Sequence, residues 1–404
     1  MRMASFAIRN PTPTGASLPL LLQSAFRPFF LLAGLQASVY IALWVAAWFF
    51  GLPLGMTPEP LLWHGHAMVF GFASAALAGF LLTAVPNWTG MPPVRGWRLG
   101  MLAGLWIAAR ILALWPAAIE TAVFTVVDLA FWPFLASLVA PSILRSNATR
   151  NGVFVVILTA LFLTDLCWHL QALGIRDVGR TGLYGALGLF IVMIAIIGGR
   201  IVPAFTVNGM RVAGQRMEII PRPWLDRAAL IALAAGLIAE AVSIPAMLQA
   251  GLFATAALLH LRRFLLWQFW RTWRIPLIWS LHLGYAWLVV GVGLKALAAL
   301  EFVPQAAALH ALGAGCVGIM VLAVMTRASL GHSGRPLVAP PSAVAAYALV
   351  GLGALGRVAG AFDLGTVTFW LTAASGIVWA AGYLVYVIGY LPILVGPRAD
   401  GRPG

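Results

Sequence analysis

The chain has 404 residues, of which 62% are hydrophobic and only 9% are charged, and its mean hydropathy is +0.96. Soluble domains carry roughly 25% charged residues, so this composition excludes a soluble protein, a disordered chain and, with only two cysteines, a secreted disulfide scaffold. The net charge of +14 is typical of arginine-rich cytoplasmic loops that set topology and contact anionic membrane lipid, and it requires no nucleic acid.

Apolar stretches of about 20 residues, the length of a helix that crosses a bilayer, recur along the whole chain. The first half contains six of them, at 26–51, 60–86, 97–116, 118–144, 152–174 and 181–202. Six more follow at 224–248, 250–270, 275–300, 304–330, 339–361 and 366–396. This pattern predicts an all-α polytopic membrane protein with about twelve transmembrane helices.

Arginines fall in alternate connections between these spans, as the positive-inside rule requires when spans are placed correctly. The opposite connections are close to neutral, with Glu59, Glu120, Asp177, Glu301, Asp363, Arg176 and Arg180. The basic side is therefore predicted to be cytoplasmic, with both termini on it. Its arginines are Arg2, Arg9, Arg95, Arg98, Arg145, Arg150, Arg211, Arg216, Arg222, Arg262, Arg263, Arg271, Arg274, Arg327, Arg335, Arg398 and Arg402.

The domain organisation is predicted to be simple. A cytoplasmic segment at 1–25 precedes one transmembrane domain at 26–396, and a cytoplasmic tail follows at 397–404. The first segment contains Pro11, Pro13 and Pro19 and lacks an apolar core before a cleavage site, so it does not resemble a signal peptide. The longest loop, 203–223, allows six-plus-six halves like those of many secondary transporters, although no internal sequence repeat accompanies it.

Histidines inside the apolar spans are the first candidates for function, because ionisable residues in a bilayer are costly. His64 and His66 begin the second span, His169 ends the fifth and His310 begins the tenth. At 1.5 Å per residue, all four lie within roughly 5 to 10 Å of the outer surface. Convergent imidazoles in apolar surroundings suit haem iron or copper. For any single histidine, the alternative is a buried side chain that bonds a backbone carbonyl.

Two of these histidines cannot share one metal on a regular helix. His64 and His66 are two residues apart, so their side chains point about 200° from each other. Either they serve two centres, or the helix is irregular near its start, where Pro58 and Pro60 lie.

The inner half holds the remaining histidines. His282 and His260 approach a common depth, which allows a second site or a proton-relay element, although a packing role is sufficient for His260. His332 lies in a Gly-rich turn, where a polar contact is expected. Other charges inside spans are Arg27, Arg110, Asp128, Asp165, Arg200, Glu240, Lys295 and Arg357.

Arginines near the outer histidines are candidate partners for haem propionates, which guanidinium groups bind well. Arg110, near the outer end of the third span, is the first candidate, and Arg176 and Arg180 are alternatives unless they are solvated or paired with Asp177. Cys167 and Cys316 lie inside spans, where cysteine usually acts as a small apolar residue.

Several sequence blocks, from about residue 23 to the last span, resemble the NnrS family of membrane proteins. The first blocks are FRPFF at 26–30, WHGHAMVFGF at 63–72 and AGFLLTAVPNWTG at 78–90. The later blocks are GRIVPAFT at 199–206, LHLGYAW at 281–287 and the stretch from His310 to MTRASLGHSGR at 325–335.

The resemblance implies a bacterial inner-membrane protein that contains haem, of b-type, and copper, and that is tied to nitric oxide, nitrosative stress and denitrification. The family's recurrent histidines match six of the seven histidines in this sequence, and His260 is the one that matches none. One departure is Ala67, where the family usually has an acidic residue; another group must replace that carboxylate if it has a role. The matching set is His64, His66, His169, His282, His310 and His332.

The leading hypothesis is therefore a haem and copper redox protein that binds nitric oxide in its outer half and either reduces it, as a nitric oxide reductase-type oxidoreductase, or relieves its damage. Electrons must come from a quinol or a periplasmic carrier, because the chain has no Cys-x-x-Cys-His haem attachment, flavin fingerprint or nucleotide loop. The alternatives are a secondary transporter for a metal or haem, and a sensor or metal-insertion partner.

Overall fold

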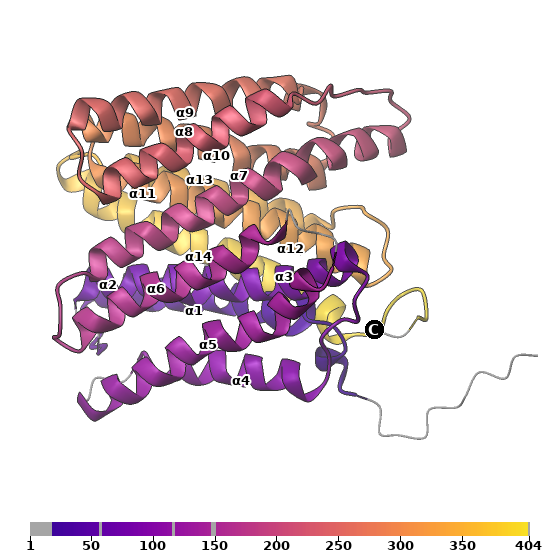
Figure 1. Cartoon of the computed structure of the whole chain (residues 1–404), viewed down its shortest axis with the longest axis horizontal. Coiled ribbons are helices and arrows are strands. Elements are labelled where there is room, and N and C mark those ends of the chain that lie inside the picture. The colour runs from indigo at the N-terminus through magenta and orange to yellow at the C-terminus, as the bar shows by residue number, and fades with distance from the viewer. Residues whose placement is uncertain (1–17, 56–58, 115–117, 147–150, 403–404) are drawn as a thin grey trace, which may run out of the picture.

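The computed structural model describes residues 18–55, 59–114, 118–146 and 151–402. Residues 1–17 of the predicted cytoplasmic segment lie outside these ranges. Pro58, which was expected to disturb the second span, also lies outside them. Within them the chain is helical and contains no strand. The long helices lie side by side with their axes in roughly one direction (Figure 1).

Nine of the described helical segments are long and apolar enough to cross a membrane, which confirms a multi-pass membrane protein. Each of the twelve predicted spans contains a helix, but three of these helices fall outside that set. One of the three, α4, is only 16 residues long. The twelve-span count therefore stays a prediction. The three are α4 (Trp97–Leu112), α8 (Pro223–Ala241) and α9 (Ala246–Leu266).

The first half of the chain carries His64, His66 and His169, and the second half carries His310. After a short 3-10 turn, η1 (Leu20–Leu22), the helices are α1 (Phe26–Phe50), α2 (Pro60–His66), the π-helical segment η2 (Ala67–Ala73), α3 (Ser74–Thr89), α4, α5 (Ala118–Leu144), α6 (Val153–Ala172) and α7 (Gly179–Val212).

The second half continues with the same kind of element. It contains α8, α9, the 3-10 turn η4 (Phe269–Arg271), α10 (Pro276–Ala299), α11 (Gln305–His310), the π-helical segment η5 (Ala311–Val317), α12 (Gly318–His332), α13 (Pro341–Ala359) and α14 (Thr366–Val395).

The helix boundaries follow from local chemistry. Proline occupies the first turn of α2, α8, α10 and α13, where its missing N–H costs nothing. Gly51 ends α1 with a φ of 74°, a left-handed conformation that glycine adopts without steric cost.

Packing brings together helices that are far apart in the chain. α14 packs against α1 and α13, so the C-terminal helix closes the bundle against the N-terminal one. α6 packs against α5 and α7, and α10 packs against α9. These neighbours decide which of the polar side chains inside the spans can meet.

Candidate metal and cofactor sites

Two of the predicted histidines end a helix at the point where it widens into a π-helical turn. His66 precedes η2, and His310 precedes η5. Isolated π turns are rare and frequently lie at functional sites. The irregularity expected near the start of this helix is not found among the described residues, because α2 is regular from Pro60 through His66 and the irregular turn follows it. The other alternative, two separate centres, is left.

Side-chain donors hold the backbone carbonyls of each π turn. In η2, Gln36 Nε2 donates to the Ala67 carbonyl at 3.1 Å and Trp106 Nε1 donates to that of Gly71 at 3.2 Å. At η5, Trp379 Nε1 donates to the Ala314 carbonyl at 3.1 Å. Backbone polar groups at membrane depth need such partners, so the chain supplies the donors that make both turns stable.

The first site is a buried cluster of two histidines and two aspartates from three helices. His66 Nε2 lies 2.9 Å from Asp128 Oδ2 and 3.2 Å from Asp165 Oδ1. His169 Nε2 lies 3.2 Å from Asp128 Oδ2 and 3.8 Å from Asp165 Oδ1. One ligand atom from each residue falls within 4.8 Å of all the others. For comparison, donor atoms of a tetrahedral site with bonds of about 2.1 Å lie about 3.4 Å apart.

The hydrogen bonds of Thr125 determine which nitrogen of His169 carries a proton. The Thr125 hydroxyl donates to the Thr121 carbonyl at 2.8 Å, so at 3.0 Å it accepts from Nδ1–H of His169. In a neutral imidazole, Nε2 then carries a lone pair, which faces the Asp128 carboxylate. Two electron-rich atoms at this distance repel each other unless a proton or a metal cation lies between them.

The charge balance of the cluster also favours a cation. Arg110 from α4 donates to Asp128 Oδ1, and Trp132 Nε1 donates to Asp165 Oδ2 at 2.8 Å. Two ionised aspartates and one arginine leave one negative charge when both histidines are neutral. Burying a net charge in apolar surroundings is costly. The ring of Trp168, 4.1 Å from that of His66 between centroids, helps exclude water.

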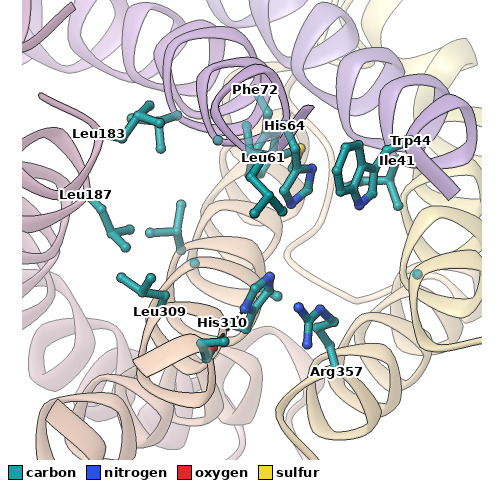
Figure 2. A pocket seen from close by; sticks show the side chains of 18 of the residues that line it. Ile41, Trp44, Leu61, His64, Phe72, Leu183, Leu187, Leu309, His310 and Arg357 are labelled. Carbon is teal, nitrogen blue, oxygen red and sulfur yellow. Dashed lines mark hydrogen bonds between the residues drawn. The ribbon is translucent and has the colours of Figure 1, made fainter. Parts of the chain in front are cut away.

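The second site is a cavity of about 390 Å³ lined by His64 and His310. The two imidazoles face each other across it, with Trp44 and Arg357 beside them (Figure 2). Their ring centroids are 6.4 Å apart and their planes differ by 14°. Two imidazoles that bind one metal from opposite sides through bonds of about 2.0 Å have centroids about 6 Å apart.

A backbone contact fixes the proton position of His310 in the same way. Its Nδ1 lies 2.8 Å from the Ala306 carbonyl, which can only accept a hydrogen bond. Nδ1 is therefore the protonated nitrogen, and Nε2 carries the lone pair. Metal-binding histidines usually have this arrangement, in which the second nitrogen donates to a carbonyl. The volume of the cavity lies in the range of roughly 300 to 1,000 Å³ that is usual for ligand pockets.

The structure places the three arginines considered as propionate partners in different surroundings. Arg110 is paired with Asp128 in the cluster, and Arg180 lines the cavity. Arg176 is exposed and does not line it. Arg357 also lines the cavity, so Arg180 and Arg357 are the cations best placed for an acidic group there.

The inner histidines lie apart from both sites. His282 Nε2 lies 2.9 Å from the Thr206 hydroxyl, and its Nδ1 is buried with no partner among the described residues. His260 Nδ1 lies 2.7 Å from the Tyr285 hydroxyl. The His332 ring packs 5.7 Å from that of Phe26. None of the three lines the cavity or joins the cluster.

Asp128 and Asp165 are the site residues that sequence reasoning missed. Both were recognised as charges inside spans, but not as ligands. One signal was available: Asp165 and His169 are four residues apart and therefore share a helix face. These aspartates also place carboxylates beside His66, so the alanine at Ala67 does not leave this site without an acidic group.

Comparison with protein families gives a match over most of the chain. A family model described as "NnrS protein" matches residues 20–398, which is nearly the whole chain. No curated protein matches the sequence.

Proposed function

Because this chain belongs to the NnrS family, we propose that it is a haem and copper membrane redox protein that binds nitric oxide and supports its reduction. The observation that carries the proposal is the buried cluster of His66, Asp128, Asp165 and His169, in which the His169 lone pair faces a carboxylate. A metal cation there would remove the repulsion and offset the negative charge.

The cluster would hold the copper. Two imidazoles and two carboxylates form a mixed nitrogen and oxygen donor set, which suits Cu(II) and also non-haem iron. A metal at this position would supply redox chemistry in a water-poor site. Arg110 pairs with Asp128 and would orient its carboxylate toward the two histidines, and Thr125 would hold the proton of His169 on Nδ1.

The cavity would hold the haem, bound without covalent attachment. His64 and His310 are the candidate iron ligands, and Arg180 and Arg357 the candidate partners of the propionates. Apolar side chains such as Leu183 and Phe190 line the rest of the cavity. His64 and His66 lie on the same helix, so the two centres would be close neighbours.

Reduction of two nitric oxide molecules to nitrous oxide and water consumes two electrons and two protons. The electrons come from an external donor, a quinol or a periplasmic carrier. The protein is proposed to lie in the bacterial inner membrane with twelve spans and both termini in the cytoplasm, so the two sites lie in the outer half. The π turns occur in the second and tenth predicted spans, which are not equivalent in two halves of six, so they give no specific support to a transporter.

An absorption spectrum with iron and copper analysis of the purified protein tests the proposal. We expect a Soret band, stoichiometric copper and a shift of the Soret band when nitric oxide is added to the reduced protein. Formation of nitrous oxide in the presence of a donor supports a reductase, and binding without turnover supports a protective or sensing role. A folded protein without haem and copper after expression with both supplied would contradict the proposal.

A further inference from the structure

A second polar cluster lies where α1 begins and α14 ends. This end of the bundle is opposite the one at which α2 and α11 lie (Figure 1). Its central residue is Arg27, whose surface is fully buried. Arg27 Nη1 donates to the carbonyls of Leu394 at 2.8 Å and Gly396 at 2.7 Å. This contact satisfies carbonyls at the C-terminus of α14, where a positive charge is also favoured by the helix dipole.

Capping α14 accounts for only one of the three nitrogens of Arg27. Nε and Nη2 are buried and have no hydrogen-bond partner among the described residues. A buried donor on a charged group that lacks a partner is costly. The side chain therefore presents two free donors to its surroundings, and guanidinium groups use such a pair to bind phosphate or carboxylate oxygens.

Two further arginines lie close enough for their charges to act on Arg27, namely Arg335 and Arg398. Arg335 Nη1 is also buried without a partner in the described part of the chain. Arg398 is held in place by its own contact to the His332 carbonyl at 2.7 Å. The next residue, Ala399, donates from its backbone nitrogen to the Ser333 carbonyl at 2.9 Å, so the tail is fastened to the end of α12.

One carboxylate is not enough to balance this charge. Asp400 bonds Arg398 through contacts of 2.8 and 2.5 Å, and these hold the pKa of the exposed Asp400 carboxyl at about 2. Among the described side chains it is the only acidic group that pairs with any of the three arginines, and it also lies 4.0 Å from Arg402. Residues 1–17, which precede α1, contain no aspartate or glutamate. Three arginines and one aspartate leave two positive charges.

We propose that Arg27, Arg335 and Arg398 form a binding site for a phosphate group, supplied by the headgroup of an acidic phospholipid or by free phosphate. The site lies at the end of the bundle that carries most of the arginines, the predicted cytoplasmic side, where acidic lipid is attracted. This site does not depend on haem or copper, and Arg27, His332 and Arg335 all belong to sequence blocks that the metal sites do not explain.

Thermal unfolding of the purified full-length protein in detergent tests this site, with the metal content held constant. The ligands are inorganic phosphate, short-chain phosphatidylglycerol, short-chain phosphatidylcholine and sodium chloride at matched ionic strength. We expect a saturable rise of the unfolding midpoint with phosphatidylglycerol or phosphate, beyond the effect of the other two. A rise with phosphatidylglycerol alone identifies a lipid headgroup, and an equal rise with phosphate identifies the free anion.

Arg335→Gln removes one free donor and one charge without touching the cap of α14. It should weaken the apparent affinity about tenfold or more, because charge-assisted hydrogen bonds to phosphate are strong. Arg335→Lys keeps the charge and should bind with intermediate affinity, and it serves as the test if Arg335→Gln does not fold. Arg216→Gln replaces an exposed arginine in the connection between α7 and α8; it is the matched control and should bind like the unaltered protein. Absence of a specific rise, or equal binding by Arg335→Gln and the control, would overturn the site.

Discussion

His64 and His66 lie two residues apart on α2, yet their imidazoles line two different sites. The His64 ring faces that of His310 across the cavity, and His66 Nε2 contacts Asp128 and Asp165. A step of two residues turns a regular helix by about 200°, and α2 stays regular through His66. The helix α2 therefore lies between the cavity and the cluster and contributes one histidine to each.

Because the two sites are separate, we predict that each pair of histidines binds a different metal. His64→Ala and His310→Ala should lower haem content and leave copper bound, whereas His66→Ala and His169→Ala should lower copper and leave haem. Pyridine-haemochrome and copper analysis of each monodisperse variant measures both. Loss of the same metal from all four variants would show a single centre, and full retention of both metals in all four would remove both sites.

Thr125 should control metal affinity without being a ligand. Thr125→Val removes the acceptor that keeps the proton on Nδ1 of His169, so the ring is free to turn or to change tautomer. We expect metal affinity at the cluster to fall roughly 10- to 100-fold, as for other partners of metal-binding histidines. Thr159→Val is the control, because Thr159 is exposed on α6, the helix that carries His169, and its hydroxyl donates only to the Val155 carbonyl of that helix. Equal copper affinity in the two variants would show that Thr125 does not orient His169.

The two aspartates should differ in what their removal does to folding. Asp128→Asn leaves the buried Arg110 without its counter-charge and should destabilise the protein by about 3 to 5 kcal/mol, whereas Asp165→Asn removes a partner of the neutral Trp132 indole and should cost less. Adding Arg110→Gln to Asp128→Asn should recover part of the loss. Thermal unfolding of the single and double variants measures this coupling, and additive effects would count against a stabilising ion pair.

His260 should be dispensable for metal binding, because it lies outside both sites and its contact is to Tyr285. His260→Leu removes a hydrogen bond worth about 1 kcal/mol and should leave haem and copper content unchanged. Loss of either metal from a well-folded variant would place His260 among the functional residues.

The positions of the helices followed from hydropathy, but the composition of the sites did not. Apolar runs and their length located a helix in each predicted range, because burial in lipid imposes apolar runs of known length. Depth along the helix placed four histidines near one surface. It could not separate them into two pairs, since that depends on which way each helix is rotated and on its neighbours. Asp128 reaches His66 only because α5 and α6 pack together beside α2.

The π turns and the partners of the arginines also could not be predicted from the sequence. The sequence of 67–73 has no proline or other signal for a wide turn, and the turn depends on donors from distant helices, such as Gln36 and Trp106. Arg110 was expected near haem because of its depth, but its direction is set by Asp128. Ion pairs between helices require the helix packing to be known first.

The ends of the transmembrane domain should lie on the same side of the membrane. Arg27, at the start of α1, donates to the Gly396 carbonyl that follows α14, and the backbone of Gly96 donates to the Leu22 carbonyl at 2.8 Å. The arginines concentrated near these contacts favour the cytoplasm. The predicted loop at 203–223 is shorter in the structure, because α7 continues to Val212. Reporters fused after Gly404 and in the connection between α7 and α8 should therefore be active only if they work in the cytoplasm. Activity of a periplasm-only reporter at both positions would show that the orientation is the opposite one and that the cavity lies in the inner half. Activity at one position alone would show that the chain crosses the membrane an odd number of times between the two positions.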